Sequence, residues 1–293
     1  MSGSILVTGA SGHLGRRVVE LLLERGNGAR IIAATRKPES LAELAAKGVE
    51  ARRADFDDAA SLTAAFHGVE RVLLISTDAL DEPGKRARQH ARAVQAVAAA
   101  GVKHVAYTSI INPVGSKIMI SKDHADTEAE LAKHGVPFTV LRNNVYSDYQ
   151  FTGLKRAFAS GKLVDARASG KVGFVTREDC ARIAAAVIAE PPSGNQVLDV
   201  TGPAALSSAE LAAFASEISG RSIEHQPIPL AALTEGMVQH GLPRPLAEVY
   251  ASFDAGIADG ELDVASENVA RFTGTQPQSM KEFLRANQAA WAS

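Results

Sequence analysis

The sequence predicts an α/β protein with a doubly wound parallel sheet and a smaller C-terminal α+β lobe. Two observations carry this prediction. Through the first half of the chain, short β-branched runs alternate with longer Ala- and Leu-rich amphipathic stretches, which is the pattern of a parallel sheet with helices on both faces. The first of these runs leads directly into a turn with three evenly spaced glycines, where a helix is predicted to begin.

The predicted strands leave room for helices between them. The stretch after the glycine-rich turn has an apolar stripe that includes Leu14, Val18 and Leu22, which indicates a helix. The next helix is predicted to begin at Pro38 and to end at Gly48, because proline suits a first helical turn and glycine suits a helix end. The predicted strands are residues 4–8, 30–34, 49–52, 71–75, 103–108 and 137–142, and the helices before the fifth strand are 13–25, 38–48, one ending near residue 68, and 83–100.

Two lobes are expected, residues 1–150 with the sheet and residues 151–293 as a smaller lobe that covers its carboxyl edge. A helix at about residues 176–190 is predicted to return to the first lobe, because Thr176 begins a helix-start signature ahead of an alanine-rich run. The clearest break follows at residues 191–194, and a terminal helix is expected at about residues 278–291.

Composition narrows the class of protein. Of 293 residues, 46% are hydrophobic and 22% are charged, which excludes a disordered chain and a collagen-like repeat. A net charge of −2 offers no footprint for nucleic acid or an anionic membrane, and no apolar run approaches the roughly 18 residues of a membrane span. The single cysteine, Cys180, cannot form an internal disulfide, which favours a reducing compartment, the cytoplasm.

The glycine-rich turn is the strongest local signal. Gly9 permits the tight turn, Gly12 lets the backbone approach a pyrophosphate, and Gly15 lets the helix pack closely on the sheet. The N-terminus of the helix then supplies N–H donors and the positive end of its dipole to the phosphates. A plain turn is the alternative, but strand, turn and helix together favour a dinucleotide site. Its predicted residues are Gly9, Ser11, Gly12, His13, Leu14 and Gly15.

The end of the second strand indicates which dinucleotide is bound. An NAD site usually has a carboxylate there, whereas this chain has Arg36 and Lys37. A guanidinium binds a 2′-phosphate well, so NADP(H) is predicted, with solvated loop charges as the alternative. Asp55 and Phe56 follow the third strand, where the adenine ring is usually flanked, although Asp55 would equally serve as a helix cap.

The fourth and fifth strands end in hydroxyl-bearing residues. Because the reactive half of the cofactor lies at the carboxyl ends of these strands, their side chains are candidates for contacts with nicotinamide or substrate, with strand-end capping as the alternative. No tyrosine is followed by lysine four residues later, which argues against an ordinary alcohol dehydrogenase or a sugar-nucleotide epimerase. The candidates are Ser76, Thr77, Tyr107, Thr108 and Ser109.

Further candidate side chains follow the fifth and sixth strands. His124 and Glu128 are spaced to share a helix face, so Glu128 is predicted to orient the imidazole, with a plain surface histidine as the alternative. No third ligand lies at a recognisable spacing, so no metal is predicted. The basic run at residues 85–92 is interpreted as a solvated helix face. The catalytic candidates are Tyr107, His124, Asn143 and Tyr146, beside an aromatic wall or core of Tyr146, Tyr149, Phe151 and Phe174.

Together, these residues resemble the NmrA-like family of atypical short-chain dehydrogenases, in particular its NAD(P)H:quinone oxidoreductase type 2 and triphenylmethane reductase branch. The resemblance covers nearly the whole chain, and the loop at residues 110–120 departs from it. The matching segments are residues 9–15, 35–38, 68–76, 100–109, 124–128, 141–143 with Tyr146, and 176–177.

The resemblance implies an NADP(H)-binding Rossmann domain, a small C-terminal substrate lobe and a crevice for a planar aromatic acceptor. The leading hypothesis is a reductase that passes hydride from NADPH to a quinone, with a proton from His124 or water. A quinone needs positioning more than a strong acid, because its product anion is a stabilised phenolate. The alternative is a non-catalytic NADP(H) sensor that regulates a protein partner, and a dye reductase is a third hypothesis. The oligomeric state is left open, a homodimer included.

Overall fold

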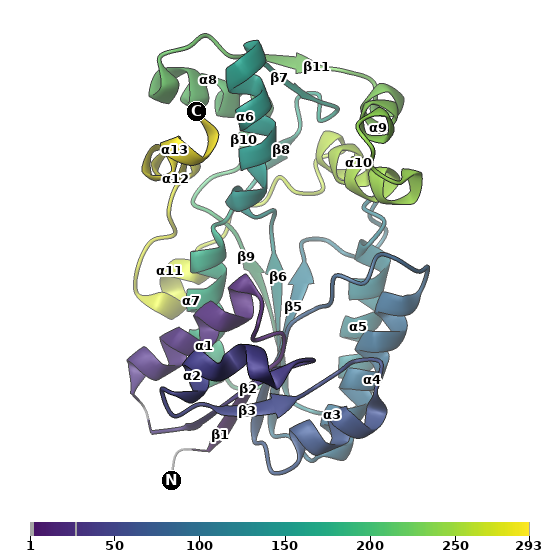
Figure 1. The fold of residues 1–293 in the computed structure, drawn as a ribbon, viewed down its shortest axis with the longest axis vertical. Helices are drawn as coiled ribbons and strands as arrows, with labels where there is room; N and C mark the ends of the chain where they lie inside the picture. The colour runs from purple at the N-terminus through teal and green to yellow at the C-terminus, as the bar shows by residue number, and fades with distance from the viewer. Residues whose placement is uncertain (1–2, 27, 293) are drawn as a thin grey trace. The chain divides into compact units, whose positions relative to one another are not determined.

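A computed structural model describes residues 3–26 and 28–292 (Figure 1). The chain forms two compact units. The first takes in the described residues of Met1–Ser109 together with Asp123–Arg142 and Glu178–Leu198, and the second consists of Ile110–Lys122, Asn143–Arg177 and the described residues of Asp199–Ser293. A domain boundary near residue 150 stays a prediction. Among the described residues, no helix is both long and apolar enough to cross a membrane.

The predicted doubly wound sheet is confirmed, with seven strands in the order β3-β2-β1-β4-β5-β6-β9. The four pairings from β3 to β5 are parallel, with Ile5 beside Ile31 on one side and beside Arg71 on the other. The strand order reverses between β1 and β4, which is where such sheets open a crevice for a ligand. The strands are β1 Ser4–Val7, β2 Arg30–Thr35, β3 Glu50–Arg53, β4 Arg71–Leu74, β5 His104–Ile110, β6 Phe138–Asn143 and β9 Gln196–Val200.

The helices of the first unit cover both faces of the sheet. Figure 1 shows α1 and α7 on one face and α3, α4 and α5 on the other. An ion pair between Arg17 and Glu178, with 2.8 Å between Nε and Oε2, joins α1 to α7. These helices are α1 His13–Arg25, α2 Ala42–Ala45, α3 Ala59–Phe66, α4 Lys85–Ala99, α5 Ser121–Lys133 and α7 Arg177–Ala189, with a 3₁₀ turn, η1, at Pro38–Leu41.

Two predictions about these elements were wrong. The helix expected at residues 38–48 is a 3₁₀ turn followed by one short α-helix, because the backbone of Leu41 (φ −101°, ψ 14°) leaves the helical region. Leu41, which ends the 3₁₀ turn, and Leu44 in the short α-helix are both fully buried. The strand β9 was not predicted, because its short segment follows the Pro-Pro-Ser-Gly break and lies outside the regular alternation.

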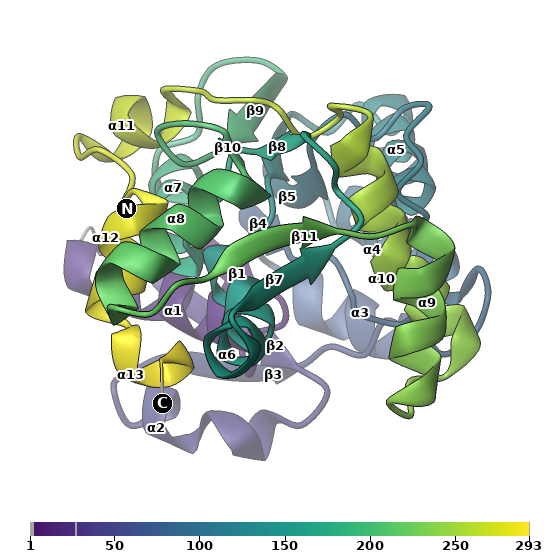
Figure 2. The same ribbon diagram turned by 90° about the horizontal axis from the view of Figure 1, so that it is seen from above.

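The second unit is an α+β arrangement with two small sheets. The strands β8 and β10 pair antiparallel, and β7 and β11 pair in parallel, side by side in Figure 2. Its strands are β7 Lys162–Asp165, β8 Lys171–Val172, β10 Leu206–Ser207 and β11 Glu224–Pro227. Its helices are η2 Ser147–Tyr149, α6 Gln150–Ser160, α8 Ser208–Ser219, α9 Leu230–Gln239, α10 Arg244–Ala258, α11 Asn268–Thr273, α12 Met280–Ala286 and α13 Gln288–Trp291.

Aromatic side chains contribute to the largely aliphatic core of the second unit. Phe151 stacks on Phe283 with 5.2 Å between ring centroids, and Phe174 is buried in the same cluster. Trp291 is fully buried and its indole Nε1 donates to the carbonyl oxygen of Leu284. The predicted terminal helix is therefore well packed, although it is divided into α12 and α13 at residue 287.

Candidate active site

The glycine-rich turn joins β1 to α1 with almost no space for side chains. Gly9 has a φ of +61°, which favours glycine, and its carbonyl oxygen accepts the Gly12 N–H at 2.9 Å. A Cβ on Gly15 would lie 2.4 Å from the Gly9 carbonyl oxygen, which is shorter than real Cβ contacts allow. The first turn of α1 therefore rests directly on the peptide of Gly9.

The turn is tied to its neighbours and leaves the start of α1 accessible to a ligand. The Ser11 hydroxyl lies 2.8 Å from that of Thr35 at the end of β2. Gly12 is the N-cap residue and makes no side-chain cap. The first N–H groups of a helix have no partner within the helix, so they form an anion-binding end.

The basic side chains at the ends of β2 and β3 differ in whether other side chains bind them. Arg36 and Lys37 are exposed, and the side chain of Arg36 makes no hydrogen bond or ion pair with another described residue. Arg53, which pairs in register with Thr35 at the end of β2, is instead bonded to Asp58 and Asp55. Arg36 is thus the guanidinium at this edge that is available to a ligand.

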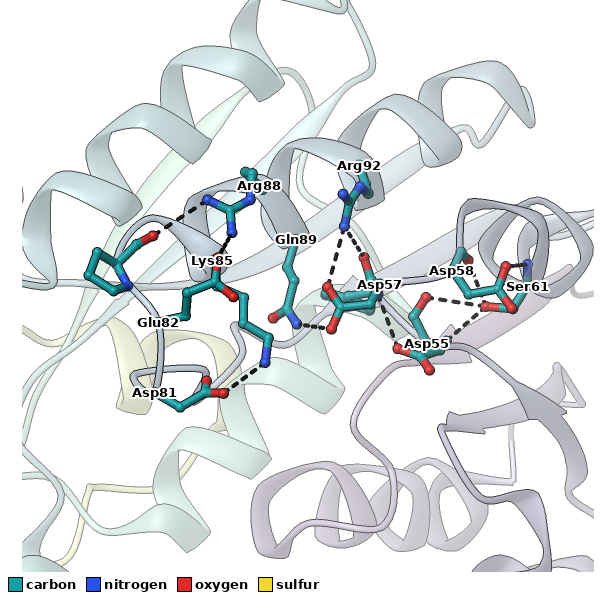
Figure 3. A network of polar contacts seen from close by, with 12 residues as sticks. Asp55, Asp57, Asp58, Ser61, Asp81, Glu82, Lys85, Arg88, Gln89 and Arg92 are labelled. Carbon is teal, nitrogen blue, oxygen red and sulfur yellow. Dashed lines mark hydrogen bonds and ion pairs between the residues drawn. The ribbon is translucent and has the colours of Figure 1, made fainter.

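The segment after β3 is organised by its own carboxylates (Figure 3). Asp58, not Asp55, caps α3, because its carboxylate accepts the Ser61 N–H at 3.1 Å. Asp55 accepts the Asp57 N–H at 3.0 Å in a local turn. The alternative role of Asp55 as the helix cap was therefore wrong. Phe56 is buried in the core of the first unit, so a contact of Phe56 with a ligand would come from its backbone.

The hydroxyls at the ends of β4 and β5 are bonded to each other or to neighbouring groups. Thr108 Oγ1 accepts the Ser76 N–H at 2.9 Å, and Ser109 Oγ donates to Glu128 Oε1 at 2.6 Å. Glu128 also binds Arg142, with 2.6 Å between Oε2 and Nη2. The prediction that Glu128 orients His124 was wrong, because Glu128 is engaged by Arg142 and Ser109.

Tyr107 and His124 lie in the interior of the first unit. Tyr107 is 0% exposed, and its hydroxyl lies 2.9 Å from His124 Nδ1. Burial raises the pKa of Tyr107 above its usual value. Burial, together with the charge of Arg86, lowers the pKa of His124 well below its usual value. The catalytic role predicted for these two residues therefore has no support from their position, and the alternative of a surface histidine was also wrong.

The interpretation of the basic run on α4 as a solvated face holds for Lys85, Arg88 and Arg92 but was wrong for its other polar residues. Arg86, Gln89 and His90 are buried, whereas Lys85 and Arg88 lie outward and bind Asp81 and Glu82, as Figure 3 shows. The buried residues are three and four positions apart and continue the apolar stripe formed by the later residues Ala93, Val94 and Val97. This spacing was the signal that could have identified them.

In the second unit, an amide and two tyrosines lie together. Asn143 Nδ2 donates to Tyr146 Oη at 3.1 Å, and Asn143 Oδ1 is buried without a hydrogen-bond partner among the described residues. Tyr149 is 62% exposed, with its ring centroid 5.5 Å from that of Tyr146. The guanidinium of Arg177 lies 4.9 Å from the Tyr149 ring centroid. This cluster presents an aromatic and polar surface, whereas Phe151 and Phe174 belong to the core.

Metal binding finds no support in the side-chain arrangement. In the part of the chain that the structure describes, no three or more His, Cys, Asp and Glu side chains are placed to hold a metal ion.

The chain belongs to the NmrA-like family, whose model matches residues 1–284. It is 36% identical over 280 residues to quinone oxidoreductase 2 of Escherichia coli, covering 96% of this chain and 97% of that protein. It is 29% identical to an NAD(P)H azoreductase of Xenophilus azovorans, covering 99% of both chains. The resemblance inferred from the sequence is confirmed.

Solved structures give the same relationship. The NADPH complex of the Escherichia coli NADPH-dependent quinone oxidoreductase matches with a TM-score of 0.91 and 35% identity, covering 96% of this chain and 99% of that chain. Citrobacter sp. triphenylmethane reductase complexed with NADP(H) matches with a TM-score of 0.90 and 35% identity, covering 97% and 99%.

Gly15→Ala tests the close contact in the turn. The added methyl group would meet the Gly9 peptide, so we expect the unfolding free energy to fall by about 3 kcal/mol. Gly153→Ala is the control, because Gly153 lies inside α6 and a methyl group added there would have no atom within 4 Å, and it should gain up to about 1 kcal/mol. Urea unfolding measures both, and equal effects would contradict the packing account.

The buried histidines predict a pH dependence of stability. Burial lowers the pKa of His90 to about 3 and that of His104 to about 4, against roughly 6.5 in an unfolded chain. Below pH 6.5 the unfolded chain binds protons that the folded chain does not, so the unfolding free energy falls as the pH decreases toward 4. His104→Gln should reduce the loss between pH 7 and pH 5 by about 2 kcal/mol. Urea unfolding at the two pH values would refute this if wild type and variant lost equal stability.

Proposed function

We propose that this protein is an NADPH-dependent reductase that transfers hydride to a quinone or a similar planar, electrophilic aromatic acceptor. The observation that carries the proposal is the glycine-rich turn beside the point where the strand order reverses, with the guanidinium of Arg36 available at the end of β2. Relatives named as a quinone oxidoreductase and an azoreductase, similar over almost their whole length, support the same chemistry.

The residues of the turn fit the phosphates of the cofactor. A Cβ on Gly15 would clash with Gly9, and the N-cap position of Gly12 carries no side chain, so the backbone N–H groups at the start of α1 are open to a pyrophosphate. Arg36 would hold the 2′-phosphate, with Lys37 beside it adding positive charge. When bound, NADPH supplies the hydride, and the chain supplies position and electrostatics.

Asn143 and Tyr146 are the residues we assign to the acceptor. Asn143 Nδ2 donates a hydrogen bond to Tyr146 Oη, which holds the amide and the phenol together as the polar groups that we assign to an acceptor oxygen. We assign the proton of the product to water, since Arg86 Nη2 lies 2.7 Å from Nε2 of the buried His124. The phenolate formed from a quinone is stabilised by delocalisation and needs no strong acid.

A nucleotide sensor is the second candidate function. Tyr107 and His124, the titratable residues predicted to be catalytic, both lie in the interior. A chain that only binds NADP(H) and regulates a protein partner would have the same first unit.

We further propose a cytoplasmic location, because Cys180 is the single cysteine of the sequence, cannot form an internal disulfide and is buried, which suits a reducing compartment. The oligomeric state, including a homodimer, stays a prediction.

The rate of NADPH consumption with a panel of quinones tests the reductase. Loss of NADPH absorbance should depend on the quinone and exceed that with NADH, and a reaction without acceptor gives the blank. If the protein binds NADPH but no quinone stimulates its consumption, the reductase is refuted and the sensor is favoured.

Arg36→Glu tests the choice of cofactor. A carboxylate would repel the 2′-phosphate, so the Kd for NADPH should rise by about 100-fold while the Kd for NADH changes little. Arg30→Glu is a charge-matched control, because Arg30 is exposed at the opposite end of the same strand. Calorimetric titration measures both ligands, and an unchanged preference for NADPH in the Arg36 variant would show that the 2′-phosphate is bound elsewhere.

A further inference from the structure

Thr77, in the segment after β4, has both of its main-chain polar groups bonded by buried side chains of α4. Its N–H donates to His90 Nε2 at 3.0 Å, and its carbonyl oxygen accepts from Arg86 Nε at 2.7 Å. His90 is 0% exposed and Arg86 is 4% exposed. Two buried side chains thus bind the N–H and the carbonyl oxygen of one residue in the loop after β4.

The hydrogen-bond donors around the buried rings of His90 and His124 determine which ring nitrogen carries the proton. Since the Thr77 N–H occupies Nε2 of His90, the ring proton is on Nδ1, which lies 3.1 Å from Thr127 Oγ1. The Thr127 hydroxyl in turn donates to the Asp123 carbonyl oxygen at 2.6 Å.

His124 is oriented in the same way. Arg86 Nη2 donates to its Nε2 at 2.7 Å, so His124 Nδ1–H donates to Tyr107 Oη. Each ring is therefore held as one neutral tautomer.

Burying the polar side chains of Arg86, His90 and His124 is unfavourable compared with an apolar core. A buried guanidinium is stabilised only where its hydrogen bonds are made, and replacing such groups by packed apolar side chains is often neutral or stabilising. Arg86 makes those bonds to Thr77 and His124, with Asp123 Oδ2 3.5 Å from Nη1. Stability alone does not account for directing these bonds to a loop.

The loop that they hold adjoins the glycine-rich turn. The Ile75 N–H donates to Thr8 Oγ1 at 2.9 Å. A Cβ on Gly9 would lie 3.7 Å from the Ile75 Cβ. The segment from Ile75 to Thr77 and the turn therefore form one continuous edge at the point where the strand order reverses, and a dinucleotide binds across such an edge.

We propose that Arg86 and His90 are positioning residues that hold the Thr77 peptide and thereby shape the β4 side of the cofactor site. This inference rests on the proposed function, because it assigns a site for the nicotinamide half of NADPH. Neither side chain touches the cofactor. Their effect passes through Thr77, whose peptide they hold in one orientation.

A matched pair of variants separates positioning from simple stability. The amide of His90→Gln reaches the place of Nε2 and keeps an acceptor for the Thr77 N–H, whereas that of His90→Asn reaches only the place of Nδ1. We expect His90→Asn to raise the Kd for NADPH by about tenfold, because the Thr77 N–H loses its partner. His90→Gln should stay within about twofold of wild type.

His104 provides the control position. It is buried at the amino end of β5 and bonds Thr139 Oγ1 at 3.0 Å, so it resembles His90 but lies at the opposite edge of the sheet. His104→Asn and His104→Gln should lower the melting temperature without changing the Kd for NADPH. If the Kd of all four variants followed their melting temperatures, the positioning role would be refuted.

Amide hydrogen exchange at Thr77 tests the inference without any cofactor. The Thr77 N–H should exchange faster in His90→Asn than in His90→Gln and wild type. Equal exchange in all three would overturn the inference even if NADPH binds. If instead exchange behaves as expected and wild type binds no NADPH, the proposed function fails while the contact with Thr77 is upheld.

Discussion

The contact between the first turn of α1 and the peptide of Gly9 is the constraint on which the rest of the first unit depends. With no Cβ at Gly15, the helix begins on the carboxyl end of β1 and directs its N-terminus toward the reversal of strand order. Ile75 packs beside Gly9 on the β4 side, and the Ser11 hydroxyl contacts Thr35 on the β2 side. Both halves of a dinucleotide site are thus positioned by the same turn.

The two sides of this turn are organised by different physical means. On the β2 side, Arg36, the charge that we propose for the 2′-phosphate, is exposed and unpaired among the described residues, so it keeps its solvation in the absence of a ligand. On the β4 side, charge is buried, and Arg86 and His90 act on the backbone of Thr77. An exposed charge favours ligands of opposite charge, whereas a buried hydrogen-bond network fixes the geometry of the backbone that it binds.

The sheet and the glycine-rich turn could be predicted from the sequence, because each depends on residues that are close together in the chain. The continuous apolar run of β4 and the spacing of Gly9, Gly12 and Gly15 need no knowledge of distant residues. The partner of Glu128 could not be predicted in this way. Helical spacing places His124 on the same face, but Arg142 on β6 competes for the carboxylate and binds it with two hydrogen bonds.

The buried network was missed for a related reason. Arginine and histidine on a helix suggest solvent, and only their continuation of the apolar stripe on α4 indicates the interior. Tyr107, in the middle of β5, was expected at the site, but its side chain is buried in the core. Which face of a central strand meets the ligand depends on the packing of helices on both sides, which local sequence does not specify.

A crystal structure of the complex with NADPH tests the central claim most directly. The account predicts the pyrophosphate against the backbone at residues 12–15, the 2′-phosphate on the Arg36 guanidinium, and the nicotinamide half beside the Thr77 peptide, with Arg86 and His90 bonded to Thr77. A 2′-phosphate bound away from Arg36, or a nicotinamide half that lies away from the segment after β4, would contradict it.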